Sequence, residues 1–366
     1  MVNHLNVYGV ANIKEVIEFF NGERELKPTI VNTREEFYKN QENFPYDFAD
    51  VNGQESVKRA LEVAAAGGHN LIMIGAPGSG KSMMAKRLPG ILPPLSLGES
   101  LETTKIHSVA GKLGKDSSLI ATRPFRSPHH TISQVAMVGG GANPQPGEIS
   151  LAHHGVLFLD ELPEFNRSVL EVLRQPLEDR HISISRAKYS LDYPASFMLV
   201  ASMNPCPCGY YNHPTKACVC NPGQVQRYLN RISGPLLDRI DIQIEIVPVP
   251  FEKISEKQQA ESSASIRERV ICARKMQEKR FANHPGVYCN AQMESRLLHL
   301  YAEPDEQGLN LLRNAMTRLN LSARAYDRIL KVARTIADLD HSEQVTSIHL
   351  AEAISYRNLD RESWAG

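Results

Sequence analysis

The sequence lacks any segment suited to a lipid bilayer or to secretion. No apolar run among the 366 residues approaches the ~20 residues that a membrane-spanning helix needs. The N-terminal residues MVNHL do not show the charged-then-apolar pattern of a secretory signal. We therefore expect a cytoplasmic protein with no membrane partner.

A net charge is also absent, because 41 basic residues are balanced by 41 acidic ones. The overall electrostatic field gives no attraction for nucleic acid, so such a partner requires a local basic patch. Internal repeats and low-complexity tracts are missing as well. With 42% apolar and 22% charged residues, the composition is that of a globular chain with room for two or three domains.

Cysteine is scarce, yet four of the six cysteines crowd into one short stretch. They form two Cys-x-Cys pairs separated by nine residues: Cys206, Cys208, Cys218 and Cys220. In a cytosolic protein such a cluster indicates a metal before a disulfide, and four thiolates suit a tetrahedral structural Zn²⁺. The gap within each pair is shorter than usual, so four free thiols or a redox pair stay open as alternatives. His213 lies inside the stretch and can replace one ligand, whereas Cys272 and Cys289 are expected to be ordinary thiols.

A glycine-rich loop lies between an apolar stretch at 70–74 and a helical pattern at 83–88. This order predicts a phosphate-binding loop, whose backbone N–H groups turn toward an anion at a helix N-terminus. Lys81 can reach the β and γ phosphates of ATP, and Ser82 can bind Mg²⁺. The alternative is a turn that binds nothing. The nucleotide-binding candidates are Gly75, Ala76, Pro77, Gly78, Ser79, Gly80, Lys81, Ser82 and Asp160.

Two further apolar stretches end in polar residues that suit phosphate chemistry. Residues 155–159 lead into Asp160, which can hold Mg²⁺ through water opposite Ser82, and Glu161, which can polarise the attacking water. Residues 199–203 lead into Asn204, whose amide can hold that water against the γ-phosphate. The alternatives are a buried strand that reaches a polar loop and an Asn that caps a loop before proline.

Arginines beyond residue 230 are candidates for stabilising charge in the transition state. Residues 231–241 hold two arginines, Arg231 and Arg239, and an arginine just before a predicted edge strand cannot easily fold back to its own phosphate loop but can reach the nucleotide of a neighbouring subunit. A surface ion pair with a nearby aspartate is the alternative. Arg324, at the start of a predicted helix, is the candidate for sensing the γ-phosphate, although Arg328 and Arg334 follow it closely.

The periodicity of apolar residues predicts an α/β domain followed by a helical one. Strands are expected at 71–74, 156–159, 197–201 and 240–247, with a hairpin at 182–191. A capping box at Ser96 opens a helix, and Asn166 is the expected N-cap of a helix through Leu173. Helical spacing recurs at 254–281, 291–302, 309–319, 323–339 and 347–356. The expected domains are residues 1–45, 46–250 and 251–366.

Four segments together resemble the magnesium-chelatase-like AAA+ ATPases, and within them the ComM/YifB branch: residues 125–131, 146–153, 158–165 and 231–241. The resemblance extends from residue 46 to 357. It implies an AAA+ core with a parallel sheet, a helical lid and a homo-hexameric ring with ATP between subunits. It assigns Lys81, Ser82, Asp160 and Glu161 to the two nucleotide motifs, Asn204 to sensor one, Arg239 to the finger and Arg324 to sensor two, acting on its own nucleotide or a neighbour's. Residues 1–45 resemble the last portion of a Lon-like N-terminal domain, so the chain looks truncated.

The resemblance also implies a partner. Residues 124–150 resemble the helix-two insertion that points into the ring channel, and the hairpin places Arg186 and Lys188 as candidates for contact with DNA. Ordinary solvated charges are the alternative for these two residues, and His129 and His130 are expected to be loop or packing residues. The branch implies a DNA motor, a branch-migration helicase in natural transformation. The other classes are a chelatase-type or protein-remodelling ATPase and a switch without turnover.

Overall fold

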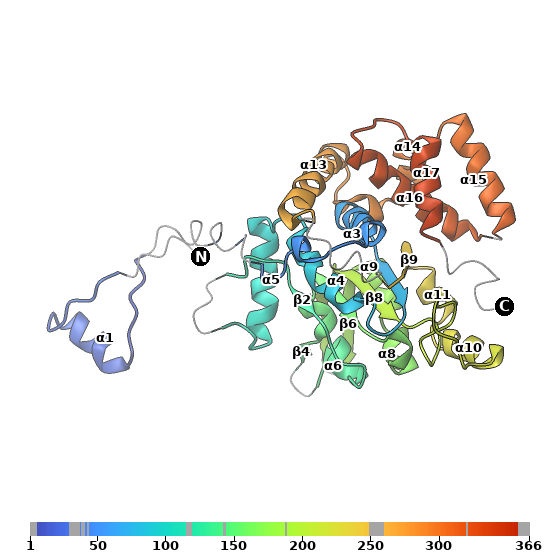
Figure 1. Cartoon of the computed structure of the whole chain (residues 1–366). Coiled ribbons are helices and arrows are strands. Elements are labelled where there is room, and N and C mark those ends of the chain that lie inside the picture. The colour runs from blue at the N-terminus through green and yellow to red at the C-terminus, as the bar shows by residue number, and fades with distance from the viewer. Residues whose placement is uncertain are drawn as a thin grey trace.

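The computed structural model builds the chain around one parallel sheet (Figure 1). It describes residues 6–28, 37, 41, 44–114, 119–141, 144–186, 189–248, 260–319 and 321–357, with residues 185, 186 and 189 described by their backbone alone. None of the helices in these ranges has the length and apolar content that crossing a bilayer requires.

The sheet has five strands in the order β2-β5-β8-β1-β9, and every neighbouring pair is parallel. Apolar runs predicted four of the five, and the structure confirms them to within two residues. Strand β2 escapes such a prediction because two residues are too few to show a pattern. The strands are β1 (Leu71–Gly75), β2 (Phe125–Arg126), β5 (Val156–Leu159), β8 (Met198–Met203) and β9 (Ile242–Ile246).

Strands β1, β5 and β8 are buried along their whole length, as parallel strands are when both faces are covered. Alternate side chains of β1 enter two different cores. Leu71 and Met73 join the core that also holds residues of α3 (Glu55–Gly67), and Ile72 and Ile74 join the core on the opposite face. The sheet therefore has an apolar layer on each side, which fixes the register of its strands.

Shorter elements complete the α/β part. The hairpin predicted at 182–191 is present as β6 and β7, and the capping box is confirmed by mutual hydrogen bonds between Ser96 and Glu99. These elements are η2 (Phe48–Asp50), α4 (Lys81–Arg87), η3 (Leu88–Gly90), α5 (Leu97–Val109), α6 (Gln134–Val138), β3 (Gly139–Gly140), β4 (Gln145–Pro146), α7 (Glu148–Leu151), η4 (Leu162–Glu164), α8 (Arg167–Glu171), α9 (Arg174–Asp179), β6 (His181–Arg186), β7 (Tyr189–Pro194), α10 (Pro222–Leu229) and α11 (Gly234–Leu237).

The helix expected from Asn166 through Leu173 is shorter than predicted. Asn166 occupies the N-cap of α8, but its side chain makes no capping hydrogen bond. Helix α8 ends at Glu171, and α9 begins at Arg174. Pro176 lacks the N–H that a continuous helix needs for the hydrogen bond to the carbonyl four residues earlier, which explains the break.

The C-terminal part is helical, as predicted, and Figure 1 shows its helices together with α3 on one side of the sheet. Helix α16 matches the predicted bounds, whereas α13 begins at Ser263 because Ser262 caps it. The boundary expected at residue 250 lies outside the described residues. The elements are α13 (Ser263–Phe281), η5 (Asn290–Gln292), α14 (Ser295–Tyr301), α15 (Glu306–Arg318), α16 (Ala323–Leu339) and α17 (Ser347–Ser355). The expected α/β core with a parallel sheet, followed by a helical C-terminal region, is thereby confirmed.

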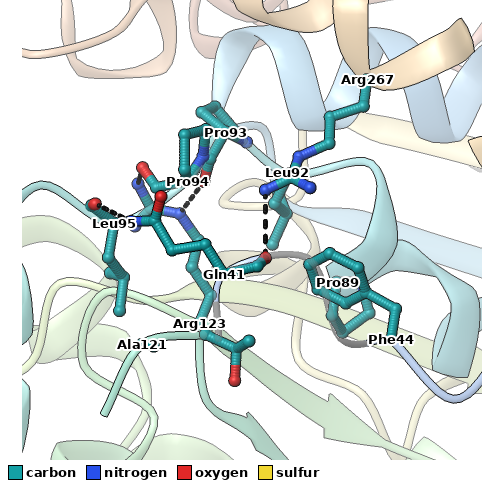
Figure 2. A pocket seen from close by; sticks show the side chains of 11 residues that line it. Gln41, Phe44, Pro89, Leu92, Pro93, Pro94, Leu95, Ala121, Arg123 and Arg267 are labelled. Carbon is teal, nitrogen blue, oxygen red and sulfur yellow. Dashed lines mark hydrogen bonds between the residues drawn. The ribbon is translucent and has the colours of Figure 1, made fainter. Parts of the chain in front are cut away.

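Gln41 and Phe44, which precede the α/β core in the sequence, contact both this core and the helical C-terminal part. Figure 2 shows Gln41 between Leu95 of the core and Arg267 of α13. Gln41 donates to the Leu95 carbonyl (2.9 Å), and the Arg267 guanidinium lies 4.9 Å from the centre of the Phe44 ring. The contact begins before residue 46, where the core was expected to start. Helix α1 (Ile13–Phe20), further upstream, has no buried residue and stands apart from the body in Figure 1.

Asp241 joins the start of β9 to the helical part. Its carboxylate is 1% exposed, accepts a hydrogen bond from Arg328 of α16 (2.9 Å) and lies 3.2 Å from His69 Nδ1. Burial raises the pKa of this carboxyl group, but Arg328 and His69 outweigh that effect and hold the pKa well below its usual value. A buried charge of this kind is tolerated because its partners remain in place.

We expect Asp241→Asn to lower the free energy of unfolding by about 3 kcal/mol or more, because it leaves the Arg328 guanidinium unpaired in a largely buried position. Asp238→Asn is the matched control. Asp238 pairs with Arg324 on the surface, where the two side chains are 34% and 67% exposed, so its loss is expected to cost less than about 1 kcal/mol. Urea denaturation followed by fluorescence measures both. Equal losses in the two variants would contradict this account.

Candidate functional site

Residues 76–80 form a loop between β1 and α4, and Lys81, the first residue of α4, is largely buried. Gly78 and Gly80 take φ values of 77° and 93°, a region that favours glycine. The Lys81 amine donates to the carbonyls of Gly75 (2.7 Å) and Ala76 (3.0 Å). It also donates to Asn204 Oδ1 (3.2 Å), which joins the loop to the end of β8. Burial lowers the pKa of Lys81, opposed by the acidic pair at the end of β5.

Asp160 is fixed by groups from three elements. Ser82 of α4 donates to its Oδ2 atom (2.6 Å), and the Glu161 N–H donates to Oδ1 (3.1 Å). Ser202, the last residue but one of β8, also donates to Oδ1. Ser202 was not among the predicted site residues, although one sequence signal marks it: it is a hydroxyl in an otherwise apolar strand, two positions before Asn204. The structure therefore brings Lys81, Ser82, Asp160 and Asn204 together at one edge of the sheet, the edge at which the parallel strands end.

Glu161 lies beside this group with an unusual backbone. Its φ and ψ are 56° and 49°, the left-handed region that costs a non-glycine residue about 1–2 kcal/mol. The side chain is 56% exposed, and its Oε2 atom lies 3.8 Å from His130 Nδ1. Glu161 thus presents its carboxylate to solvent next to Asp160, where a base acting on water can reach its target.

The residues present fit a nucleotide with Mg²⁺. The Ser79 hydroxyl inside the loop is buried and has no hydrogen-bond partner among the described residues, as expected where a further acceptor is to be bound. The hydroxyl of Ser82 and the carboxylate of Asp160 are the hard oxygen donors that Mg²⁺ prefers, directly or through water. Lys81 supplies the positive charge that phosphate oxygens require.

The candidate arginines lie at the opposite edge of the same sheet, the edge at which the parallel strands begin. Residues 238–241 precede β9, whose first residue pairs with Leu71 at the start of β1. The phosphate loop follows the far end of β1, about 13 Å of strand away. Arg324 donates to Asp238 (3.2 Å), so its guanidinium sits at the same edge as Arg239. Neither arginine is positioned to reach the phosphate loop of its own chain.

The two arginines differ in how free they are. Arg239 is 8% exposed, donates to the Pro235 carbonyl (2.6 Å) and lies 2.5 Å from Glu178 Oε1. Arg324 is 67% exposed and has Asp238 as its ion-pair partner. A role of Arg239 on another molecule therefore requires the pair with Glu178 to open, whereas Arg324 needs only a surface contact to change. Arg328 and Arg334, the neighbouring alternatives, are engaged with Asp241 and Asp338.

The four clustered cysteines converge, and all six cysteines of the chain are free. The sulfur of Cys206 lies 3.3 Å from that of Cys208 and 3.7 Å from that of Cys218, and the latter two are 3.6 Å apart. Tetrahedral Zn²⁺ with Zn–S bonds of about 2.3 Å places its ligands about 3.8 Å apart. The fourth sulfur, of Cys220, completes a set within 4.8 Å. The arrangement fits Zn²⁺.

Electrostatics within the cluster favours a thiolate at Cys208, whereas burial and the neighbouring thiols raise the pKa values of Cys218 and Cys220. Burial opposes ionisation of Cys208, but hydrogen bonds from the backbone of Tyr210 and Val219 and from neighbouring thiols lower the pKa of Cys208 to about 6. The alternative ligand His213 is engaged elsewhere, since its Nδ1 atom accepts hydrogen bonds from the N–H groups of Thr215 (3.2 Å) and Lys216 (3.1 Å).

Of the two predicted DNA contacts, the structure describes only the backbone of Arg186. Arg186 ends β6, and its backbone pairs with that of Tyr189 in β7. Its side chain is not described, and Lys188 lies outside the described residues. Their role in binding DNA stays a prediction.

Comparison with known proteins decides the family. The family model of the magnesium chelatase subunit ChlI matches residues 47–254, more than half of the chain, and the model of the ChlI C-terminal region matches residues 260–357. The chain belongs to the magnesium-chelatase-like AAA+ family. This confirms the family inferred from the motifs, and membership supports an ATPase in general, with ATP and Mg²⁺ as its suggested cofactors.

Relatives place the chain in the ComM/YifB branch of this family. The YifB protein of Salmonella typhimurium is 49% identical over 318 residues, 86% of this chain and 61% of that protein. Competence protein ComM of Haemophilus influenzae is 43% identical over 363 residues, 99% of this chain and 70% of the relative. The 38 kDa magnesium-chelatase subunit of Rhodobacter capsulatus is 26% identical over 179 residues, 44% of this chain and 50% of that subunit. The chain thus spans less than two thirds of the YifB relative.

Proposed function

We propose that the chain hydrolyses ATP as a subunit of a homo-hexameric ring that moves on DNA. The observation that carries the proposal is the separation of Lys81 and Asp160 from Arg239 and Arg324 at opposite edges of one parallel sheet. A protomer then offers a phosphate site on one side and cationic groups on the other. When protomers lie side by side in a ring, the phosphate site of one protomer faces the arginines of the next, because a heterologous contact joins two different surfaces.

In this proposal, residues of one protomer bind ATP and activate water, and two arginines of the next protomer complete the site. The loop N–H groups and Lys81 bind the phosphates, Ser82 and Asp160 hold Mg²⁺, and Asn204 orients water for the carboxylate of Glu161. Bound Mg²⁺ neutralises charge on the phosphates. Arg239 and Arg324 of the next protomer stabilise the charge that develops on the γ-phosphate.

The assignment of DNA as the substrate rests on relatives and on the hairpin. The Haemophilus relative that covers nearly the whole chain is a competence protein, and the branch implies branch migration when transforming DNA recombines. Arg186 and Lys188 supply local positive charge in a chain with no net charge. The second candidate is a chelatase-type or protein-remodelling ATPase, which the similarity to the Rhodobacter subunit favours.

ATP hydrolysis by the 366-residue chain is expected to increase when linear duplex or branched DNA is added at low salt, where phosphate contacts are strongest. Glu161→Gln is expected to keep ATP binding and to lower turnover at least ~100-fold, because it removes the base but no phosphate contact. Phosphate release and a fluorescent ATP analogue report the two quantities. Absence of stimulation by any form of DNA would favour the protein-remodelling candidate, and unchanged turnover in Glu161→Gln would remove Glu161 from its role.

Mixing two inactive variants tests whether the site is shared between subunits. Arg239→Ala is expected to abolish hydrolysis and leave nucleotide binding intact, whereas Lys81→Ala loses binding. In a mixed ring, an intact phosphate loop of the first variant can face an intact Arg239 of the second, so activity is expected to return in part. Each variant mixed with buffer is the control. A mixture as inactive as its components would contradict the shared site.

We also propose that the four-cysteine cluster holds a structural Zn²⁺. Purified protein is expected to contain about one zinc per chain by mass spectrometry of the metal, because four thiolates fill one tetrahedral site. The double variant Cys208→Ser and Cys218→Ser is expected to lose it. Cys272→Ser, at an exposed lone cysteine, is the matched control and retains the metal. Zinc content that is near zero in the wild type, or equal in all three proteins, would rule the site out.

A further inference from the structure

The four-cysteine segment turns back onto the phosphate loop. Gly209, which follows Cys208, takes a φ of +83°, and a Cβ atom there would lie 2.5 Å from Pro77 Cδ and 2.7 Å from Pro77 Cγ. A side chain does not fit at such a distance, so the backbone conformation and the contact both require glycine. Pro77 belongs to the loop that joins β1 to α4. The backbone of the cysteine segment therefore packs directly on the candidate nucleotide site.

Hydrogen bonds hold the phosphate loop on either side of this contact. The Lys81 amine donates to the two carbonyls that precede Pro77. Beyond Pro77, the Gln54 side chain donates to the Ser79 carbonyl (3.1 Å). Gly209 supports the turn of the loop between these two anchors. A change in the position of Gly209 is therefore felt at the centre of the loop, where its backbone N–H groups are expected to meet phosphate.

The position of Gly209 depends on the cysteine cluster. Its N–H donates to the Cys206 carbonyl (3.0 Å), which closes a tight turn around Cys208. Residues 210–224 are all described, and none of them is buried, so no apolar core holds this stretch in place. The converging sulfurs join its two ends instead. A metal bound to four thiolates fixes such a segment, because metal binding supplies the folding free energy that a core would otherwise supply.

The chain on both sides of the segment is anchored without help from the cluster. Asn204, at the end of β8, uses its backbone to hydrogen-bond with Tyr228 of α10. Tyr228 and Val225, from the same helix, are buried in the protein. The Asn204 amide therefore keeps its place when the middle of the segment changes. Loss of the metal is expected to affect the contact at Pro77 more than the residues that act on water.

We propose that the cysteine segment holds the phosphate loop in its nucleotide-binding shape through Gly209, and that the metal in the cluster thereby governs the affinity for ATP. The inference rests on the proposed function, in which the loop binds ATP and the four thiolates bind Zn²⁺. Gly209 is a positioning residue in this account, because it acts on phosphate only through Pro77. A loop that is held in shape before the nucleotide arrives binds it more tightly than a loop that must be ordered on binding.

Glycine substitutions test the contact while the cysteines stay intact. Gly209→Ala places a methyl group against the Pro77 ring. Gly286→Ala is the matched control, because Gly286 has nearly the same φ (+85°) but no described atom within 4 Å of its Cβ position. Pro77→Ala removes Cγ and Cδ, the atoms that the methyl group would strike. The measurements on the 366-residue chain are zinc content, the Kd of a fluorescent ATP analogue, kcat and KM for ATP, and the melting temperature.

We expect Gly209→Ala to retain zinc and to raise both Kd and KM about tenfold, as when the binding-competent loop is populated about a tenth of the time. Its kcat is expected to change less than about twofold, because the residues that act on water are untouched. Gly286→Ala binds ATP as the wild type does. In the Pro77→Ala background, Gly209→Ala adds less than about twofold to Kd, since the two residues act through one contact.

Removal of the metal tests the other half of the proposal. A chelator selective for Zn²⁺ over Mg²⁺ is expected to raise the Kd of the ATP analogue about tenfold in the wild type, and added Zn²⁺ restores the affinity. In Pro77→Ala the chelator changes Kd less than about twofold, because the contact through which the metal acts is already lost. The double variant Cys208→Ser and Cys218→Ser matches the chelated wild type. Should its melting temperature fall, the chelated wild type takes its place in the comparison.

The results separate the inference from the proposed function. Wild-type affinity in Gly209→Ala, or an equal loss of affinity in Gly286→Ala, overturns the role of the contact while the ATPase stands. Control by the metal is overturned if the chelated protein binds ATP as the zinc-loaded protein does, or if the wild type contains no zinc. If Lys81→Ala binds and hydrolyses ATP as the wild type does, the proposed phosphate site itself fails.

Discussion

The arrangement of the candidate site depends on the hydrogen bonds that the Asp160 carboxylate accepts. Ser82 reaches it from the helix after β1, Ser202 from β8 and Glu161 N–H from the end of β5. These groups meet only because the strands are parallel and in fixed register, so that their carboxyl ends share one edge. A slip of one residue in any strand would turn its apolar side chains to the wrong core and move its polar end away from Asp160.

The same sheet separates the residues proposed to bind a nucleotide from the arginines proposed to act on a neighbour's nucleotide. At its other edge, Asp241 ties the segment before β9 to α16 through Arg328, and Asp238 contacts Arg324. Arg324 of α16 thus contacts the core segment that carries Arg239, and both arginines lie at a distance from their own phosphate loop. In the proposed ring, a motion of the helical part changes the contact between Arg324 and this segment, which offers a path for coupling adjoining subunits.

Sequence alone predicted what depends on local pattern. The apolar runs before Gly75, Asp160 and Asn204 identify three buried strands, and parallel pairing of such strands brings their polar ends together. The sequence did not predict features that depend on strand register or on the partners of individual side chains. Strand β2 is too short to show a pattern. Without its pairing with β5, nothing in the sequence indicates that His130 approaches Glu161. The pairing of Arg239 with Glu178 joins elements whose contact no periodicity encodes.

The exposure of two side chains bears on the proposal that the candidate site is shared between protomers. Glu161 is 56% exposed and Arg324 67% exposed, and in water a carboxylate or guanidinium interacts weakly with nearby charges. Catalysis by fixed charges requires a site from which water is excluded. In the proposed ring, a neighbouring protomer that covers the phosphate edge would exclude water and bring its own arginines in the same contact. Assembly and activation of the proposed site are then a single physical event, since the surface that excludes water also carries the positive charge.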